Sequence, residues 1–336
     1  MKKIFFSQAL VLTIALSFVA CTKKSDVVTI IPPVVPPFVT NLINLPAGWK
    51  LNPSFNTSLP TGIQVYQFDT IFLGNTIKAF CVAYDSKNTN FEFKPIMAAT
   101  VTTPTAFASA ESGITYACIN GGFFGSNQSF SLVKYNNVVS SANIKALTRV
   151  FNSVNTSYYP TRAAFGVSST GVPSVGWIYN VGAGNDLIYS YPTVSANAIN
   201  TAPQPVPTAT FPANGAIWNT ANAIGGSPML IKNNTINITD VEELIVIDNA
   251  TSRARSAIGY NANGIVLVLA IEGGNPPYNG INLVDLASLL KNLSCTDAIN
   301  LDGGGSTSMV VGGTRTVRPS DGTERGVISA ILIKKK

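Results

Sequence analysis

One run near the C-terminal end of the chain combines the residue types that could do chemistry, Asn300-Leu-Asp-Gly-Gly-Gly-Ser-Thr-Ser-Met309. Within it Asp302 is followed by three glycines, which leave its carboxylate accessible and let backbone N–H groups turn towards anionic oxygen. The alternative is that Asp302 only closes a strand as an Asx-turn cap. We expect the run to form part of the active site of an exported enzyme.

The composition excludes several kinds of catalytic site. The sequence has no histidine, which removes Ser-His-Asp and Cys-His nucleophile systems, histidine general bases and most transition-metal sites. Acid and base chemistry therefore falls to the 16 Asp and Glu residues, to Lys, to Tyr or to solvent. The net charge of +6 comes from scattered basic residues and a lysine tail. No basic stripe with interleaved aromatics is present, so we expect no nucleic-acid partner.

Three further glycine-rich segments follow stretches that we expect to be strands. They are Asn120-Gly-Gly-Phe-Phe124, Gly225-Gly-Ser-Pro228 and Glu272-Gly-Gly274. One such segment is commonly only a turn, but four of them, two with a carboxylate, indicate a site. Glu272 is the second candidate carboxylate, although a charged residue after a strand also fits a solvent-facing position.

Two arginines precede the strand that ends at Glu272. A guanidinium can hold two oxygens of a phosphate group at once, so Arg253 and Arg255 are candidates for binding a phosphate ester. Their alternate spacing predicts that both lie on one face of a strand, and a solvated strand face is the competing interpretation.

The elements that must position these residues are best defined in the last third of the chain. Residues 265–271 form a β-branched run typical of a buried strand, and residues 298–301 predict a second strand. Between them, Asn282 is followed by leucines at helical spacing. We therefore predict a β-α-β unit. If its strands are parallel neighbours, Glu272 and Asp302 lie on one edge of the sheet, where ligands of α/β proteins gather.

The other acidic residues of this region receive structural interpretations. Asp285 stands at the third helical position after Asn282, as in an acidic variant of the capping box. We expect Asp297, Glu242 and Glu243 to be surface charges.

The start of the chain has the composition of an export signal. Residues 1–20 combine two lysines with a short apolar run that is too short to span a bilayer, so they predict a signal peptide. Cys21 follows Ala20 as in a bacterial lipobox, which predicts acylation; an ordinary secretory signal with a chance cysteine is the alternative. Residues 21–46 then form a proline-rich tether. We expect a lipid-anchored protein in the periplasm or on the outer surface of a Gram-negative bacterium.

Residues 47–336 predict one strand-rich domain of mixed α/β (α+β) class, with a central mixed sheet, the C-terminal β-α-β unit and glycine-rich strand-end loops. The chain is 46% hydrophobic and only 11% charged, which disfavours a helical bundle. Residues 168–222 form the least regular part, a predicted long insertion with Trp177, Tyr179, Tyr189, Tyr191 and Trp218. These rings predict either a carbohydrate-binding wall or simple packing onto the body.

Three cysteines remain after Cys21. Cys81 and Cys118 could pair in an oxidising compartment, and the alternative is that all three, with Cys295, are buried thiols.

Several segments together resemble the phosphodiester glycosidase family in the family's motif order. They are Asn120-Gly-Gly-Phe-Phe, Gly225-Gly-Ser-Pro, Ala254-Arg-Ser-Ala-Ile-Gly, Gly280-Ile-Asn-Leu, Asn300-Leu-Asp-Gly-Gly-Gly-Ser-Thr, and Pro319-Ser-Asp-Gly followed by Glu324-Arg325. The resemblance covers roughly Ala117 to the C-terminus. Glu272 departs from it, since the family more often has Asp there.

The resemblance implies hydrolysis of a sugar-1-phosphodiester, such as an alpha-N-acetylglucosaminyl phosphodiester, to free sugar and a phosphomonoester. The implied catalytic residues are Asp302, Glu272 and Arg255. The candidates for binding substrate or phosphate are Asn120, Gly121, Gly122, Phe123, Gly225, Gly226, Ser227, Asn300, Gly303, Gly304, Gly305, Ser306, Thr307 and Arg325. No cofactor is required, and a calcium or magnesium ion on Asp302 and backbone oxygens is left open. The alternatives are a non-catalytic glycan-binding lipoprotein and a phosphodiesterase that attacks phosphorus.

Overall fold

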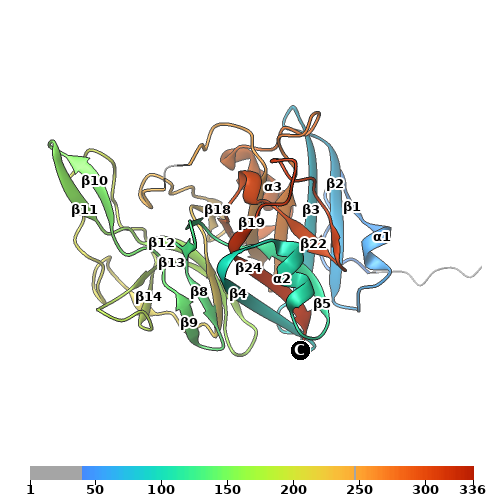
Figure 1. Ribbon diagram of the computed structural model, residues 1–336, viewed down its shortest axis with the longest axis horizontal. Coiled ribbons are helices and arrows are strands. Elements are labelled where there is room, and N and C mark those ends of the chain that lie inside the picture. Colours follow the sequence, from blue (N-terminus) through green and yellow to red (C-terminus); the bar gives the residue numbers. More distant parts are fainter. Residues whose placement is uncertain (1–39, 246) are drawn as a thin grey trace, which may run out of the picture. The chain divides into compact units, whose positions relative to one another are not determined.

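Three sheets make up most of the computed structural model, which describes residues 40–245 and 247–336 (Figure 1). The largest sheet has eight strands, whose central members are runs of β-branched and small apolar residues suited to burial on both faces. In spatial order they are β1 (Trp49–Leu51), β2 (Ile63–Phe72), β3 (Asn75–Asp85), β20 (Ile265–Ile271), β19 (Arg255–Asn261), β21 (Cys295–Asn300), β17 (Met229–Lys232) and β18 (Thr235–Ile236).

The other two sheets are smaller. One has seven strands, β15 (Ala216–Ile217), β14 (Ile188–Tyr191), β13 (Pro173–Asn180), β12 (Arg162–Val167), β16 (Asn222–Gly225), β8 (Val133–Tyr135) and β9 (Val138–Ser141). The other has five, β23 (Thr314–Arg315), β22 (Met309–Val311), β5 (Thr115–Asn120), β24 (Val327–Lys335) and β4 (Phe91–Thr102). Two hairpins, β10 (Leu147–Phe151) with β11 (Val154–Tyr158) and β6 (Phe124–Gly125) with β7 (Gln128–Ser129), stand apart.

Helices are few and short in the described residues. They are α1 (Pro53–Asn56), α2 (Pro104–Ala110), α3 (Leu283–Asn292) and the 3-10 turn η1 (Gly304–Ser306). The helix predicted after Asn282 is confirmed as α3: the Asn282 side chain accepts a hydrogen bond from the Asp285 N–H at 2.8 Å. Asp285 therefore has the capping position that was predicted for it.

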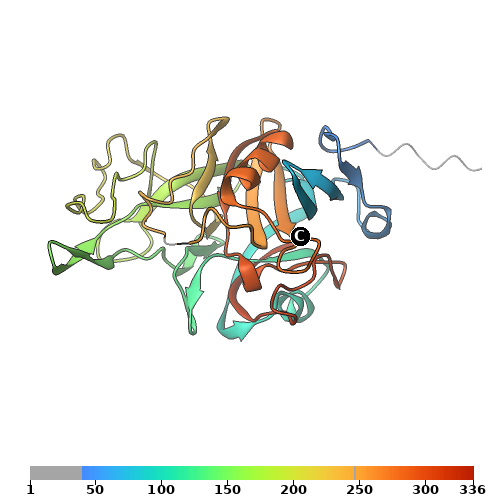
Figure 2. The same cartoon turned by 90° about the horizontal axis from the view of Figure 1, so that it is seen from above.

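Both faces of the eight-stranded sheet are buried. Alternate residues of its strands, such as Cys81 and Leu269, pack with the leucines of α3 on one face. Their neighbours, such as Val82 and Val268, pack with residues of the other two sheets on the opposite face. This is the period of two expected of a strand. Figure 2 shows α3 on one side of this sheet and the five-stranded sheet with α2 on the other.

The predicted β-α-β unit with neighbouring parallel strands is wrong, and so is the central mixed sheet. Strand β19 lies between β20 and β21 and is antiparallel to both. Every strand pairing in the described residues is antiparallel, and the fold is mostly β. Because β20 and β21 share β19 as an antiparallel neighbour, they still run in the same direction. Their ends, followed by Glu272 and Asp302, therefore lie on the same edge of the sheet.

The segment 168–222 is not a structureless insertion. It supplies β13, β14 and β15 to the seven-stranded sheet. Trp177, Tyr179, Tyr191 and Trp218 are buried within it, so these four rings cannot form a wall for stacking on sugars. Packing onto the body, the alternative interpretation, is what the structure shows.

The three cysteines after Cys21 are free thiols. Cys81, Cys118 and Cys295 are all buried, and burial raises the pKa of each thiol above its ordinary value. The structure thus has no Cys81–Cys118 disulfide.

The predicted signal peptide, Cys21 and the tether up to residue 39 lie outside the described residues. Among the residues that are described, no helix has both the length and the apolar character needed to cross a membrane.

Candidate active site

Two of the glycine-rich loops meet at Asn120 and Asp302. The Asn120 amide donates to the Asp302 carbonyl at 2.8 Å and accepts from the Ser256 hydroxyl at 2.7 Å. The Asp302 N–H in turn donates to the Gly121 carbonyl at 3.2 Å. These bonds fix the ends of β5 and β21 against each other, although the strands belong to different sheets. Asn120 therefore holds the loop that carries the candidate carboxylate.

The third loop is held to the same strand end. The Ser227 N–H donates to the Asn300 carbonyl at 2.9 Å, and the Asn300 amide donates to the Ser227 carbonyl at 2.7 Å. Gly226 lies so close to Asn300 that a Cβ would overlap with its carbonyl oxygen. A residue with a side chain at position 226 would push this loop away from β21.

Asp302 is held in a confined position. Its Oδ1 accepts from the Gly303 N–H at 2.9 Å. The Gly304 N–H, which an Asx-turn would bind, donates to the Ala254 carbonyl instead. Burial raises the pKa of this carboxyl from 3.8 to about 6, while the Ser306 hydroxyl, the Gly303 N–H and the Arg325 guanidinium favour its charged form. A carboxyl with such a pKa changes its charge near neutral pH, as catalytic carboxyls often do. Three other predicted site residues have little exposed surface: Ser306 and Thr307 of the same loop are buried, and Phe123 is half-buried.

A cavity of about 580 Å³ adjoins the Asp302 loop. It is lined by residues from four chain segments: Ser252, Arg253, Ala254, Gly274, Asn279, Gly303, Gly304, Gly305, Ser320, Asp321 and Arg325. These segments are the start of β19, the ends of β20 and β21, and the loop before β24. Because neighbouring strands are antiparallel, the start of β19 and the ends of β20 and β21 lie at the same edge of the eight-stranded sheet. The volume suits a small polar ligand.

Two arginines face this cavity, and each is paired with an aspartate. Arg253 Nη2 lies 2.7 Å from Asp248 Oδ2, and Arg325 Nη2 lies 2.5 Å from Asp321 Oδ2. About half of each arginine side chain remains exposed. Both guanidinium groups are therefore available to an anionic group in the cavity.

Gly305 allows the Arg325–Asp321 pair to lie against the loop. A Cβ at position 305 would overlap with Asp321 Oδ2 and with the Arg325 guanidinium. Both are ends of flexible side chains, so the pair would move while the backbone stays.

We therefore predict that Gly305→Ala lowers kcat/KM by about 10- to 100-fold, because a displaced guanidinium no longer meets the substrate. The melting temperature should fall by only a few degrees, since no buried contact is lost. Steady-state kinetics and thermal unfolding of the same preparation measure both effects. Gly184→Ala is the control, because Gly184 lies between β13 and β14, lines no part of this cavity and leaves free space for a Cβ. Unchanged kinetics in Gly305→Ala would mean that Arg325 does not act on the substrate.

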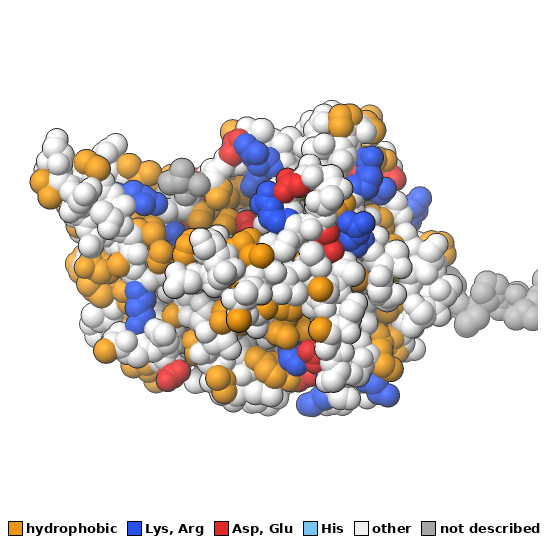
Figure 3. Space-filling view, in the orientation of Figure 1, with side chains coloured by type: hydrophobic (Ala, Val, Ile, Leu, Met, Phe, Trp, Pro, Cys, Tyr) orange, Lys and Arg blue, Asp and Glu red, His pale blue; other side chains and the backbone are white. Residues whose placement is uncertain are grey.

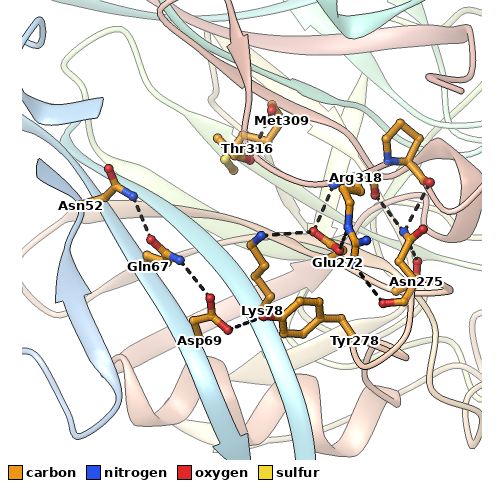
Figure 4. Close-up of polar contacts among 12 residues, drawn as sticks. Asn52, Gln67, Asp69, Lys78, Glu272, Asn275, Tyr278, Met309, Thr316 and Arg318 are labelled. Carbon is orange, nitrogen blue, oxygen red and sulfur yellow. Dashed lines mark hydrogen bonds and ion pairs between the residues drawn. The ribbon is translucent and has the colours of Figure 1, made fainter. Parts of the chain in front are cut away.

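Glu272 lies on the predicted edge but its carboxylate is occupied (Figure 4). It accepts from Arg318 Nε at 2.5 Å and from the Arg318 N–H at 3.1 Å, and Lys78 Nζ lies 3.8 Å away. Lys78 and Arg318 also lie over the ring of Tyr278, whose hydroxyl donates to Asp69. Glu272 is 1% exposed. The contacts of Glu272 fix Arg318 and the loop after β20, whose Gly274 lines the cavity. Glu272 makes no contact with Asp302.

Arg255 also differs from its prediction. It is buried, and its guanidinium donates to the carbonyls of Ile281, Asp248 and Thr251. Burial lowers its pKa to about 10. The contacts of Arg255 hold together the chain segments before β19 and before α3. Arg253, two residues earlier, lines the cavity. The two arginines thus differ in exposure, contrary to a shared solvated face.

Sequence reasoning missed Glu243, which it took for a surface charge. Glu243 is 0% exposed and accepts five hydrogen bonds, one of them from the Ser227 hydroxyl at 2.6 Å. Asp297 is likewise buried and pairs with Lys232 at 3.1 Å. No local pattern marks either residue, because their partners come from distant segments.

No group of three Asp, Glu or Cys side chains suited to hold a metal ion lies together in residues 40–245 and 247–336. The expectation of a calcium or magnesium ion on Asp302 therefore stays a prediction without support from a ligand cluster.

Charged side chains are unevenly distributed. Between Glu111 and Asp240 the only acidic residue is Asp186. In the space-filling view, blue and red side chains gather around the upper right part of the face, while the part over the seven-stranded sheet is mostly uncharged (Figure 3). A second cavity of about 480 Å³ lies at the opposite strand ends, near Lys87 and Lys336, and contains none of the predicted site residues.

The sequence is similar to a known protein family. The sequence model of the family described as phosphodiester glycosidase matches residues 114–334. The human N-acetylglucosamine-1-phosphodiester alpha-N-acetylglucosaminidase is 46% identical over 68 residues, 20% of this chain and 13% of that protein. A SPbeta prophage-derived uncharacterized protein of Bacillus subtilis is 35% identical over 79 residues, 24% of this chain and 12% of that protein. These matches thus span only about an eighth of the curated relatives.

Solved structures share the fold over most of the chain. The zebrafish N-acetylglucosamine-1-phosphodiester alpha-N-acetylglucosaminidase catalytic domain, auto-inhibited by its pro-peptide, has a TM-score of 0.55 and 17% identity. The likeness covers 86% of this chain and 88% of that one. A hypothetical protein from Synechocystis also has a TM-score of 0.55, with 19% identity over 87% of this chain and 69% of that one. At these identities the likeness establishes the fold alone.

Proposed function

The chain belongs to the phosphodiester glycosidase family, and on this premise we propose that it is an exported hydrolase that cleaves a sugar-1-phosphodiester to free sugar and a phosphomonoester. An alpha-N-acetylglucosaminyl phosphodiester is the proposed substrate class, since the human and zebrafish relatives are named for it. The observation that carries the proposal is the cavity beside Asp302, with two arginines on its wall.

In the proposed mechanism, different residues act on the phosphate and on the sugar. Arg253 and Arg325 hold the phosphate, in place of the buried Arg255. The N–H groups of Gly303 and Gly304 are already bound to the Asp302 carboxylate and the Ala254 carbonyl. A phosphomonoester is a good leaving group, so charge stabilisation at the phosphate matters more than proton donation to it. Asp302 acts at the anomeric carbon, as nucleophile or as base towards water. Glu272 contributes by fixing Arg318 and the loop beside the cavity.

This role for Asp302 predicts the pH dependence of the reaction. Burial raises the pKa of Asp302 to about 6, and only its ionised form can attack or accept a proton. We expect kcat/KM to rise with pH through about 6 and to level off above about 7. A pH series from 4.5 to 8.5 with a sugar-1-phosphodiester measures this. A profile that falls between pH 5 and 7 would assign Asp302 to the role of a proton donor instead.

The proposal also includes a place for the enzyme outside the cytoplasm. The support is the sequence of residues 1–20, Cys21 after Ala20, and the proline-rich tether up to residue 46. Cys21 would be acylated and would hold the catalytic domain in the periplasm or at the outer surface of a Gram-negative cell. Metabolic labelling with a tagged fatty acid tests this: the label should be lost in Cys21→Ala and retained in Cys81→Ala.

The reaction itself is tested by incubating the purified protein with an alpha-N-acetylglucosaminyl phosphodiester and identifying both products. Free N-acetylglucosamine and a phosphomonoester in equal amounts are expected. No turnover of any sugar-1-phosphodiester would leave a glycan-binding lipoprotein as the better account. Release of sugar-1-phosphate would instead indicate a phosphodiesterase.

A further inference from the structure

Glu243 is a buried carboxylate satisfied by neutral donors. Its Oε2 accepts from the Ala163 N–H at 2.9 Å and from the Ser227 hydroxyl at 2.6 Å. Its Oε1 accepts from the Met229 N–H at 2.7 Å, the Thr239 hydroxyl at 2.6 Å and Trp177 Nε1 at 3.2 Å. A buried charge is costly unless it is hydrogen-bonded, and five donors meet that need here.

Arg162, a buried cation, attracts this carboxylate without pairing with it directly. The Arg162 guanidinium donates to the backbone carbonyls of Glu243 and Leu244 and makes no salt bridge with the Glu243 side chain. Burial raises the pKa of Glu243, while its hydrogen bonds oppose that shift. Its partners are thus hydrogen-bond donors, and one of them, Ser227, belongs to the loop that adjoins the site. A second, Met229, is the first residue of β17, directly after that loop.

One of these contacts leads directly to Asp302. Glu243 holds the Ser227 hydroxyl, and Ser227 makes two backbone and side-chain hydrogen bonds with Asn300. Asn300 is the last residue of β21 and stands two positions before Asp302. The Asn300 N–H is also bound to the Pro228 carbonyl at 3.0 Å. The loop Gly225–Pro228 therefore connects Glu243 with the strand end that carries Asp302. Met229, whose N–H is also bound to Glu243, pairs with Ile299 and adds a second contact with the same strand.

We propose that Glu243 is a positioning residue for the hydrolysis: through Ser227 and Asn300 it fixes the place of the Asp302 carboxylate. This rests on the proposed function, because it assigns the reaction to Asp302. Glu243 touches neither substrate nor cavity. Its loss displaces Asp302 by a fraction of an ångström, which lowers the rate of the chemical step and leaves the binding of phosphate by Arg253 and Arg325 unchanged.

Glu243→Gln tests this while keeping the size of the side chain. The amide oxygen keeps the three donors at Oε1, and the amide nitrogen at the place of Oε2 can accept neither from Ser227 nor from Ala163, so both of these contacts are lost. We expect kcat to fall about 10- to 100-fold with KM within about twofold of the wild-type value. Glu242→Gln is the matched control, because it removes the same charge one residue away; it should keep both constants. A fall in Glu243→Gln that lies only in KM, or equal effects in the two variants, overturns the proposal.

Ser227→Ala separates positioning from general stability. It removes one of the five hydrogen bonds to Glu243 and should lower kcat to a similar extent. If both residues act along one path, the double variant Glu243→Gln/Ser227→Ala should lose no more than about threefold beyond the worse single variant. Multiplicative losses in the double variant would mean that Glu243 does not act through Ser227.

Amide hydrogen exchange measures whether Glu243 fixes the backbone at Asp302, and it does not depend on enzyme activity. The N–H groups of Leu301 and Asp302 are bound to the carbonyls of Ser256 and Gly121. In Glu243→Gln we expect a peptide that covers residues 299–303 to exchange at least about fivefold faster than in wild type, and in Glu242→Gln at the wild-type rate. Unchanged exchange overturns the proposal. Faster exchange in a protein that hydrolyses no sugar-1-phosphodiester would support the positioning and refute the proposed reaction.

Discussion

Asp302→Asn is expected to lower kcat/KM for a sugar-1-phosphodiester by at least about 1,000-fold. The amide cannot attack the anomeric carbon or accept a proton, while it keeps the size of the side chain and can still accept the hydrogen bond from the Gly303 N–H. The fold should be retained, because the backbone contacts of Asp302 with Asn120 and Gly121 do not depend on the charge. Steady-state kinetics beside circular dichroism separate the two effects.

The same variant should be at least as stable as the wild type near pH 7.5. Because the folded-state pKa of about 6 exceeds the ordinary value of 3.8, the folded protein binds this proton more tightly than the unfolded chain does. The resulting gain in stability is fully present below about pH 4 and is lost as the pH rises through 6. At pH 7.5 the ionised carboxylate thus lowers stability by about 1–3 kcal/mol, and Asn removes that penalty. Asp285→Asn, at the helix cap, is the control and should keep its activity; wild-type rates in Asp302→Asn would remove Asp302 from the mechanism.

Glu243→Ala is expected to lower the free energy of unfolding by about 3–5 kcal/mol. The change leaves five donors without an acceptor in a site that solvent does not reach, and it opens a cavity beside Trp177. Urea unfolding followed by intrinsic fluorescence measures the loss. Glu242→Ala, with a partly exposed side chain, should cost less than about 1 kcal/mol. A similarly small loss in Glu243→Ala would show that its hydrogen bonds contribute little to stability.

Glu243 also shows where reasoning from sequence stops. Its neighbours in the chain, Glu242 and Asp240, have the composition of a surface turn, and the apolar run 244–247 that follows does not show which of the two glutamates is buried. Its acceptor role depends on donors at positions 163, 177 and 227, which β12, β13 and the loop after β16 bring together. Such burial is a property of the tertiary fold, so a local pattern cannot contain it.

Local signals did predict local structure. The cap at Asn282 and the leucine spacing predicted α3, and the apolar runs predicted β20 and the second half of β21, because these signals act within one element. The order of strands was predicted wrongly, since β19 pairs with β20 through the register Arg255↔Ile271 and separates it from β21. Placement of Glu272 and Asp302 on one edge depended only on strand direction and was therefore unaffected.

The part of the candidate site that consists of glycine-rich loops could be predicted from the sequence. The glycine-rich loops at Asn120, Gly225 and Asp302 do meet, because a missing Cβ lets backbones approach, as at Gly226. The charged groups were harder to assign. Arg253 and Arg255 are equivalent in sequence spacing, and only the fold decides that the first faces the cavity and the second is buried against three carbonyls.

The central claim is that Asp302 directs cleavage of the bond between the sugar and the phosphate oxygen. Hydrolysis in water enriched with ¹⁸O tests it most directly, with mass spectrometry of both products. Attack at the anomeric carbon places the ¹⁸O in the released sugar and none in the phosphomonoester. Appearance of ¹⁸O in the phosphomonoester would mean attack at phosphorus and would contradict the mechanism.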